Sequence, residues 1–539
     1  MQKDNSPSGG PPNDNLTTAA QSTRMQRFLK GVEWLGNLLP HPVILFVWMS
    51  VFLLVLSALL SYLGVSVLDP RPEGAKGRSE DGMIQVVNLL NGEGLARIVE
   101  NLVTNFTGFV PLGTVLVALL GVGIAERSGM ISAALRGLVM NAPRKMVTFT
   151  IVFAGIMSNT AAELGYVVLI PLAGVIFHSL GRHPLAGIAA AFAGVSGGYS
   201  ANLLLGTVDP LLSGITQEAA RIIDPEYSVG AEANWYFMVV STFLISGLGY
   251  FVTEKIVEPS LGKYDPNDAD DPSVLESKIS RLMPVEKKGL IWAGISMLIF
   301  SLLLAWTVVP ADGILRNAET GLVSGSPFLK GIVVFIFVFF AIPGYIYGKI
   351  TGSMKNNQDV VDAMSHAMSS LSIYIVLVFF AAQFTAFFNW SNLGSVMAVS
   401  GATFLNDIGL TGPLLLVGFI LICAVVNLML GSASAQWAVT APIFVPMLML
   451  TGYAPEMIQA AYRIGDSTTN IITPMMSYFG LIMAVAIRYK KNTGVGTLMA
   501  MMLPYSITFL IGWVLLFLIW VFVLGLPVGP GSETFYPAR

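Results

Sequence analysis

The chain has 539 residues, of which 54% are hydrophobic and 11% charged, and its formal net charge is -3. A water-soluble protein of this size would need more polar surface, so lipid is the expected solvent. The sequence has no long Lys/Arg cluster with interleaved aromatic residues, which argues against nucleic acid as a partner. Its single cysteine, Cys423, excludes an internal disulfide and a cysteine-based metal site.

Residues 1–40 are predicted to be a disordered cytosolic tail. They are rich in Ser, Gly, Pro, Asn and Gln as far as Thr23 and then turn basic. The apolar run from Val43 to Val65 is too long for a secretory signal and has no small-residue cleavage site after it. We therefore expect this run to remain in the membrane as the first span.

Further apolar runs are long enough to cross a hydrocarbon core of about 30 Å as helices. The nine predicted spans are 42–65, 106–125, 185–207, 234–254, 289–309, 330–350, 373–390, 457–487 and 503–526. Two other apolar stretches, 146–178 and 411–451, are interrupted by Ser158-Asn159-Thr160 and by Gly431-Ser432-Ala433-Ser434. Because backbone groups at such a break need protein or water as partners, each stretch is predicted to be a re-entrant hairpin.

The Lys and Arg residues of the short loops orient the chain with its amino terminus in the cytoplasm. The loops then assigned to the cytoplasm carry Arg127, Arg136, Arg144, Lys145, Arg182, Lys349, Lys355, Arg488, Lys490 and Lys491. The opposite loops, 66–105, 208–233 and 310–328, are acidic or mixed. This topology predicts a bacterial inner-membrane protein whose first hairpin enters from the cytoplasm and whose second enters from the periplasm. The carboxyl terminus would be periplasmic.

The two halves of the chain follow the same order of elements. The first half, 41–254, has the hairpin 146–178 and then an interrupted helix at 185–222. The second half, 289–539, has the hairpin 411–451 and then an interrupted helix at 457–487. A mixed-charge cytosolic linker, 255–288, is predicted between them. The predicted fold is an all-α polytopic membrane protein with nine transmembrane helices and two oppositely oriented re-entrant hairpins, arranged as an inverted repeat.

Small polar residues lie where the hairpin tips should meet the interrupted helices, which is where transporters of this build bind substrate and coupling ion. The candidates from this reasoning are Ser158, Asn159, Thr160, Asn202, Ser432, Ser434 and Asn470. Such residues also pack membrane helices, which is the structural alternative. Trp437 follows closely and could stack on a planar ligand, although Trp also marks membrane interfaces.

Ionisable groups inside a span cost about 2.5–3.5 kcal/mol on translocon scales, so each needs a partner or a function. Arg463 and Asp466 lie three residues apart on one helix face, where they could form a structural ion pair. Asp466 could instead exchange a proton, or bind Na+ with Asn427, which lies in an otherwise apolar arm. Glu163, beside the first tip, and Asp209, before Pro210, are further candidates.

Metal and nucleotide chemistry have no motif in the sequence. The four histidines fall at predicted helix ends or in loops without a ligand spacing, and no P-loop sequence occurs. No cofactor is therefore expected, and transport would be driven by a proton or sodium gradient. A membrane-embedded enzyme and a passive channel are the competing functions. The sequence offers no histidine in the middle of a span to act as a catalytic base, which argues against an enzyme. If the protein were a channel, Asp466→Asn would not change its conductance.

Three motifs together carry a family likeness: the Ser158-Asn159-Thr160 tip, the run from Gly431 to Trp437, and the run from Tyr462 to Pro474. They resemble the AbgT family, the bacterial p-aminobenzoyl-glutamate transporters, over nearly the whole chain after residue 25. The resemblance implies a homodimer and a folate-related substrate, either p-aminobenzoyl-glutamate for uptake or sulfonamide antimetabolites for efflux. The positions that match the family's functional motif are Asn427, Trp437, Pro455, Arg463 and Asp466, followed by Ser434 and Pro474.

The chain is also similar to sodium-coupled dicarboxylate carriers, which have a comparable Ser-Asn-Thr hairpin tip, and such a carrier is the alternative function. The second hairpin departs from their pattern because Ser432-Ala433-Ser434 stands where they repeat the triplet. This departure argues against a two-sodium site like theirs. A ligand with carboxylates and an aromatic amide suits Arg463, free amide groups at the tips, and Trp437 as a flat neighbour.

Overall fold

The computed structural model describes residues 40–70, 78, 81–161, 164–271, 281–323 and 325–536. Within these ranges the chain is helical except for loops, an isolated bridge and one antiparallel hairpin, β1 (Ser66–Leu68) with β2 (Met83–Gln85). Nine helices of the described residues are long and apolar enough to cross a membrane. The prediction of an all-α polytopic membrane protein is therefore confirmed. The predicted tail, apart from Pro40, and Glu163 lie outside the described residues.

The helices of the first half differ widely in length, from 4 to 21 residues among those described. They are α2 (Pro42–Tyr62), α3 (Gly92–Thr107), α4 (Val110–Arg127), α5 (Met130–Met140), α6 (Val147–Ser158), α7 (Ile170–Ser179), α8 (Pro184–Phe192), α9 (Val208–Ala220), α10 (Trp235–Val252) and α11 (Glu258–Leu261). Three π-helical segments, Gly165–Leu169, Ala193–Gly197 and Thr253–Val257, adjoin α7, α8 and α10.

The second half is also built of helices of different lengths. Its helices are α13 (Pro284–Val308), α14 (Pro327–Lys330), α15 (Ile332–Thr351), α16 (Asn357–Ser370), α17 (Ser372–Trp390), α18 (Leu393–Asp407), α19 (Pro413–Leu430), α20 (Ala433–Leu450), α21 (Pro455–Thr469), α22 (Phe479–Tyr489) and α23 (Val495–Leu518). A 3-10 turn, Asn470–Ile472, ends α21, and a π-helical segment, Ile519–Val523, ends α23.

Seven of the nine predicted spans have a counterpart among the nine membrane-length helices of the described residues. The other two such helices are α19 and α20, the arms of the second predicted hairpin. The predicted spans 185–207 and 457–487 are instead broken into shorter helices. Because α19 and α20 are each long enough to cross, the re-entrant character of the hairpins, like the opposite entry sides, stays a prediction.

Several boundaries differ from the sequence prediction. The predicted span 106–125 is the end of a longer helical stretch, Gly92–Arg127, bent where α3 meets α4. Helical structure extends through α11 to Leu261 and α13 begins at Pro284, so both ends of the predicted linker 255–288 are helical in the described residues. Its role as a cytosolic linker stays a prediction. The helices α5, α16 and α18 were not predicted, because they are too short or too polar to form an apolar run of membrane length.

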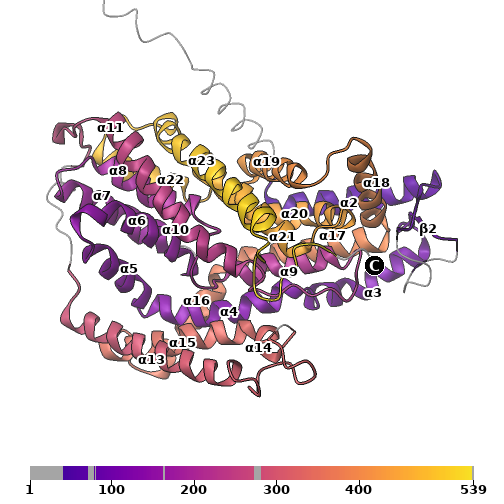
Figure 1. Ribbon diagram of the computed structural model, residues 1–539, viewed down its shortest axis with the longest axis horizontal. Helices are drawn as coiled ribbons and strands as arrows, with labels where there is room; N and C mark the ends of the chain where they lie inside the picture. The colour runs from indigo at the N-terminus through magenta and orange to yellow at the C-terminus, as the bar shows by residue number, and fades with distance from the viewer. Residues whose placement is uncertain are drawn as a thin grey trace, which may run out of the picture.

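One group of helices packs along one side of the molecule. In Figure 1, α13 and α15 lie along the lower edge, with α4 and α16 next to them. Two glycines allow α4 and α15 to approach closely: a Cβ atom on Gly121 would lie 2.2 Å from the carbonyl oxygen of Phe337, and one on Gly344 would lie 2.6 Å from Cα of Ala125. Small residues at such crossings are typical of membrane helix packing.

The largest hydrophobic core joins elements from both halves. It includes residues of α6 to α10 together with residues of α17 to α23. The interrupted helices lie in this core, so their breaks are enclosed by protein rather than by lipid, as free backbone groups at membrane depth require. Ser200, in the first break, donates its backbone N–H to Oγ of Ser467 on α21 at 3.1 Å. The two interrupted helices therefore touch where they lose regular structure.

Candidate functional site

The tip of the first predicted hairpin is closed by hydrogen bonds to its own backbone. Ser158 Oγ donates to the carbonyl of Gly155 at 2.6 Å, and Thr160 Oγ1 donates to that of Met157 at 2.7 Å. Asn202, from the first interrupted helix, donates Nδ2 to Thr160 Oγ1 at 3.2 Å. Ser158 and Thr160 thus stabilise the tip, and the bond from Asn202 connects the tip to the irregular part of the first interrupted helix.

Asn159 differs from the residues around it. Only 4% of the residue is exposed, yet in the part of the chain that the structure describes neither atom of its amide group has a hydrogen-bond partner. A buried amide without partners costs about 1–3 kcal/mol, so such a group needs an explanation. Asn159 is the tip residue that remains available to a ligand, ion or water.

The end of α21, where the second interrupted helix loses regular structure, is organised around Asn427 on α19. Its Nδ2 lies 2.7 Å from the carbonyl oxygen of Asp466, 2.9 Å from Oδ1 of Asn470 and 3.0 Å from Oγ1 of Thr469. Asn427 is fully buried. The first arm of the second predicted hairpin, α19, is thereby tied to the end of α21.

Several buried oxygen atoms near the end of α21 lack a hydrogen-bond donor among the described residues. Both carboxylate oxygens of Asp466 and Oδ1 of Asn427 are buried, and none has a hydrogen-bond partner among the described residues. Within those residues no group of three or more His, Cys, Asp or Glu side chains gathers, so a site for a transition metal is not indicated. Oxygen ligands at the end of a half-helix suit Na+ in transporters of this build, and a proton would satisfy the carboxylate equally well.

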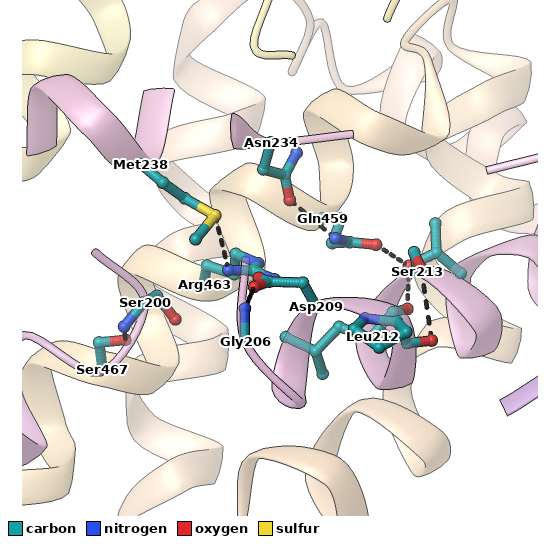
Figure 2. Close-up of polar contacts among 12 residues, drawn as sticks. Ser200, Gly206, Asp209, Leu212, Ser213, Asn234, Met238, Gln459, Arg463 and Ser467 are labelled. Atoms are coloured by element: carbon teal, nitrogen blue, oxygen red, sulfur yellow. Dashed lines mark hydrogen bonds and ion pairs between the residues drawn. The ribbon is translucent and has the colours of Figure 1, made fainter. Parts of the chain in front are cut away.

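Arg463 pairs with a carboxylate other than Asp466. Its Nη2 lies 2.5 Å from Oδ1 of Asp209, and both side chains are 4% exposed. The structural alternative of an Arg463–Asp466 ion pair is therefore wrong, because Asp209, in the first turn of α9, approaches from the other half of the chain and takes this place. Its second oxygen accepts the backbone N–H of Gly206 at 2.7 Å. Figure 2 shows Arg463 between this carboxylate and the sulfur of Met238.

Trp437 is enclosed by protein. It is fully buried, its ring stacks on Tyr462 with centroids 4.2 Å apart, and its Nε1 donates to Oγ1 of Thr216 at 2.8 Å. Thr216 in turn donates to Gln459, which bonds to Asn234. Tyr462 covers one face of the indole ring and Trp437 is not among the residues that line the cavity beside the two breaks, so in this structure Trp437 packs against α21. Its predicted role as the flat neighbour of a ligand stays a prediction.

A cavity of ≈ 400 Å³ lies beside the two breaks. Of the predicted site residues that the structure describes, only Ser432, Ser434 and Asn470 line it. Ser432 precedes α20 without capping it through its side chain, so the free N–H groups at the start of this helix lie at the cavity wall. A helix amino end of this kind favours an anion.

The cavity is also lined by aromatic residues that the sequence interpretation missed. They are Tyr166, Tyr199, Tyr374, Tyr478 and His366. Tyr166 and Tyr478 stack on each other with centroids 4.5 Å apart; Tyr166 lies just after the tip of the first predicted hairpin, and Tyr478 lies in the irregular segment between α21 and α22. Their position beside these irregular segments was the available signal, whereas the sequence prediction named Trp437.

The two prolines of the predicted set differ in location. Pro455 is the first residue of α21, eleven residues before Asp466, which places it about 16 Å away along the helix axis. Pro474 lies at the second hairpin tip, because its neighbour Thr473 donates Oγ1 to the carbonyl of Leu428 at 2.8 Å. Gly431 has φ +59° there, and a Cβ atom on it would lie 2.9 Å from the backbone of Met475. The tip thus requires glycine.

Comparisons with known proteins agree on one family. The model of the AbgT putative transporter family matches residues 27–536. The p-aminobenzoyl-glutamate transport protein of Escherichia coli (strain K12) is 37% identical over 517 residues, covering 96% of this chain and 99% of that protein. The structure of Neisseria gonorrhoeae MtrF, which is said to illuminate a class of antimetabolite efflux pumps, is 67% identical, has a TM-score of 0.88 and covers 94% and 100% of the two chains. The Alcanivorax borkumensis YdaH transporter is 46% identical, has a TM-score of 0.84 and covers 91% and 100%.

Proposed function

This chain belongs to the AbgT putative transporter family, and we propose that it carries p-aminobenzoyl-glutamate or related folate-pathway compounds by ion-coupled alternating access. The related compounds include sulfonamide antimetabolites, which the protein would export as an antiporter. The names of the family and of its relatives point to a transporter rather than an enzyme. We further propose a homodimer in a bacterial inner membrane, with the amino terminus in the cytoplasm and the carboxyl terminus in the periplasm.

The observation that carries this proposal is the cavity at the start of α20. Ser432 and Ser434 bring uncapped N–H groups to its wall, and Tyr166 and Tyr478 supply flat apolar faces. A carboxylate of the substrate would accept hydrogen bonds from the helix amino end, while its aromatic ring would pack against a tyrosine. Arg463 is already neutralised by Asp209, so we assign it to joining the two halves rather than to direct anion binding.

Ion coupling is proposed through a short chain of contacts. Asn470 lines the cavity and accepts a hydrogen bond from Asn427, which also bonds to the backbone of Asp466. A buried carboxylate without a partner is costly, and a bound Na+ or proton at Asp466 would offset that cost. The side-chain amide of Asn427 contacts both the Asp466 backbone and the Asn470 side chain. Binding of an ion or proton at Asp466 would therefore alter the position of Asn470 in the substrate cavity.

The test is a flux measurement in proteoliposomes that contain the purified full chain. Labelled p-aminobenzoyl-glutamate, a labelled sulfonamide and a labelled dicarboxylate are each supplied under imposed proton and sodium gradients of either sign. We expect movement of a folate-related compound that depends on one gradient and is lost in Asp466→Asn. Movement of the dicarboxylate alone would favour the sodium-coupled dicarboxylate carrier. A flux that does not saturate as the substrate concentration rises, and that Asp466→Asn leaves unchanged, would indicate a channel.

A further inference from the structure

A second cavity, of ≈ 340 Å³, lies between α10, α13 and α15 and shares no lining residue with the substrate cavity. Its walls are mostly apolar and aromatic, and they include Trp235, Tyr236, Phe300, Leu304, Phe335 and Phe339. A cavity of about 300–1,000 Å³ with such walls and a few polar groups is typical of small-molecule sites. Nothing in the proposed transport cycle uses it.

Glu232 is the one charged residue among the described residues that line this cavity. Only 7% of it is exposed, and its Oε2 is buried without a hydrogen-bond partner in the described chain. Since no Lys or Arg side chain lines the cavity, an ionised Glu232 has no counterion there. An ionised carboxylate in apolar surroundings is unfavourable unless a cation or a donor accompanies it.

The cavity wall around Glu232 is held in place by backbone contacts. The Glu232 carbonyl accepts the backbone N–H of Trp235 at 2.9 Å, and the indole Nε1 of Trp235 donates to the carbonyl of Leu203 at 3.0 Å. The carboxy-terminal segment adds a bond from Ser532 Oγ to the carbonyl of Ala233 at 2.7 Å. A site that is formed before binding loses less freedom when a ligand enters.

We propose that this cavity binds a hydrophobic amine, whose ammonium group donates to Glu232 while its apolar body packs against the aromatic walls. Aromatic faces attract cations as well as apolar groups, which suits the same ligand. A free aromatic amine and the ethanolamine headgroup of a lipid share this chemistry. The wall includes Leu203 to Leu205, which follow Asn202 in the first interrupted helix, so the occupant would contact the backbone that leads to Asp209.

The test uses the full chain in nanodiscs of phosphatidylcholine and phosphatidylglycerol, with 1-naphthylmethylamine as probe and 1-naphthalenemethanol as its uncharged counterpart. Fluorescence anisotropy is measured against empty nanodiscs. We expect saturable binding of the amine, about tenfold or more tighter than that of the alcohol. Glu232→Gln should remove this preference and leave binding of the alcohol unchanged. Glu533→Gln, which removes an exposed carboxylate from the carboxy-terminal segment, is the matched control and should change neither affinity.

A second variant tests the location independently of charge. Leu304→Trp adds bulk to the α13 wall and should weaken binding of both probes. Equal affinities for amine and alcohol in the unmodified chain, or an amine affinity that survives Glu232→Gln, would overturn the proposal. Adding phosphatidylethanolamine to the nanodiscs separates the two sources: competition with the amine that depends on Glu232 identifies the lipid headgroup, and undiminished amine binding identifies a free amine. None of these measurements depends on the transported substrate.

Discussion

Replacing Asp209 with Asn removes one charge of the buried pair with Arg463 and should destabilise the protein by about 3–5 kcal/mol. The magnitude follows from burial, because both side chains are 4% exposed and the remaining guanidinium would have no counterion at 2.5 Å. The lost pair joins segments 254 positions apart in sequence, so the damage should extend to the contact between the two halves. We expect Arg463→Gln to have a similar effect.

The assay is thermal unfolding of the purified chain in detergent, followed by flux measurements on the same preparations. The double variant Asp209→Asn with Arg463→Gln removes both charges and should recover most of the stability that either single variant loses, which gives a large coupling energy. The control is Asp271→Asn, whose partner Arg488 has a side chain 51% exposed, and which should cost less than about 1 kcal/mol. If the Asp209 variant costs no more than this control, or the double variant equals the sum of the two single variants, the reasoning is refuted.

Three further results are expected. Asp466→Asn should keep the fold but abolish gradient-driven flux, and a retained gradient-driven flux in proteoliposomes would exclude Asp466 as the coupling group. Gly431→Ala should reduce transport strongly and lower the unfolding temperature, because φ +59° and the Met475 backbone leave no room for Cβ; unchanged flux would contradict this account of the tip. Burial raises the pKa of Glu232, in the loop before α10, from 4.5 to about 7. Because the folded-state pKa lies above the unfolded one, ionisation costs stability increasingly as the pH rises from 4.5 to 7. Glu232→Gln should therefore raise the unfolding temperature at pH 8 by an amount that vanishes near pH 4, and a pH-independent difference would contradict that cause.

The hydropathy of the sequence and its interruptions determined the class of protein and the places where its helices break. Apolar runs of about twenty residues can be solvated only by lipid, and a cluster of small polar residues within such a run needs partners wherever it occurs. For this reason the breaks after Ser158 and around Gly431 lie within the predicted stretches. The short or amphipathic helices α5, α16 and α18 leave no such signature, because packing against other helices rather than contact with lipid stabilises them.

Only the tertiary structure decided which side chains are partners. Arg463 has Asp466 three residues away on its own helix, yet it pairs with Asp209 from the other half, and Trp437 stacks on Tyr462 of another helix. Tyr166 and Tyr478 likewise meet although 312 positions separate them in the sequence. Hydropathy reports the solvent around each segment, whereas these contacts depend on how distant segments pack. A single sequence therefore carries the locations of the breaks but not the identity of the groups that meet there.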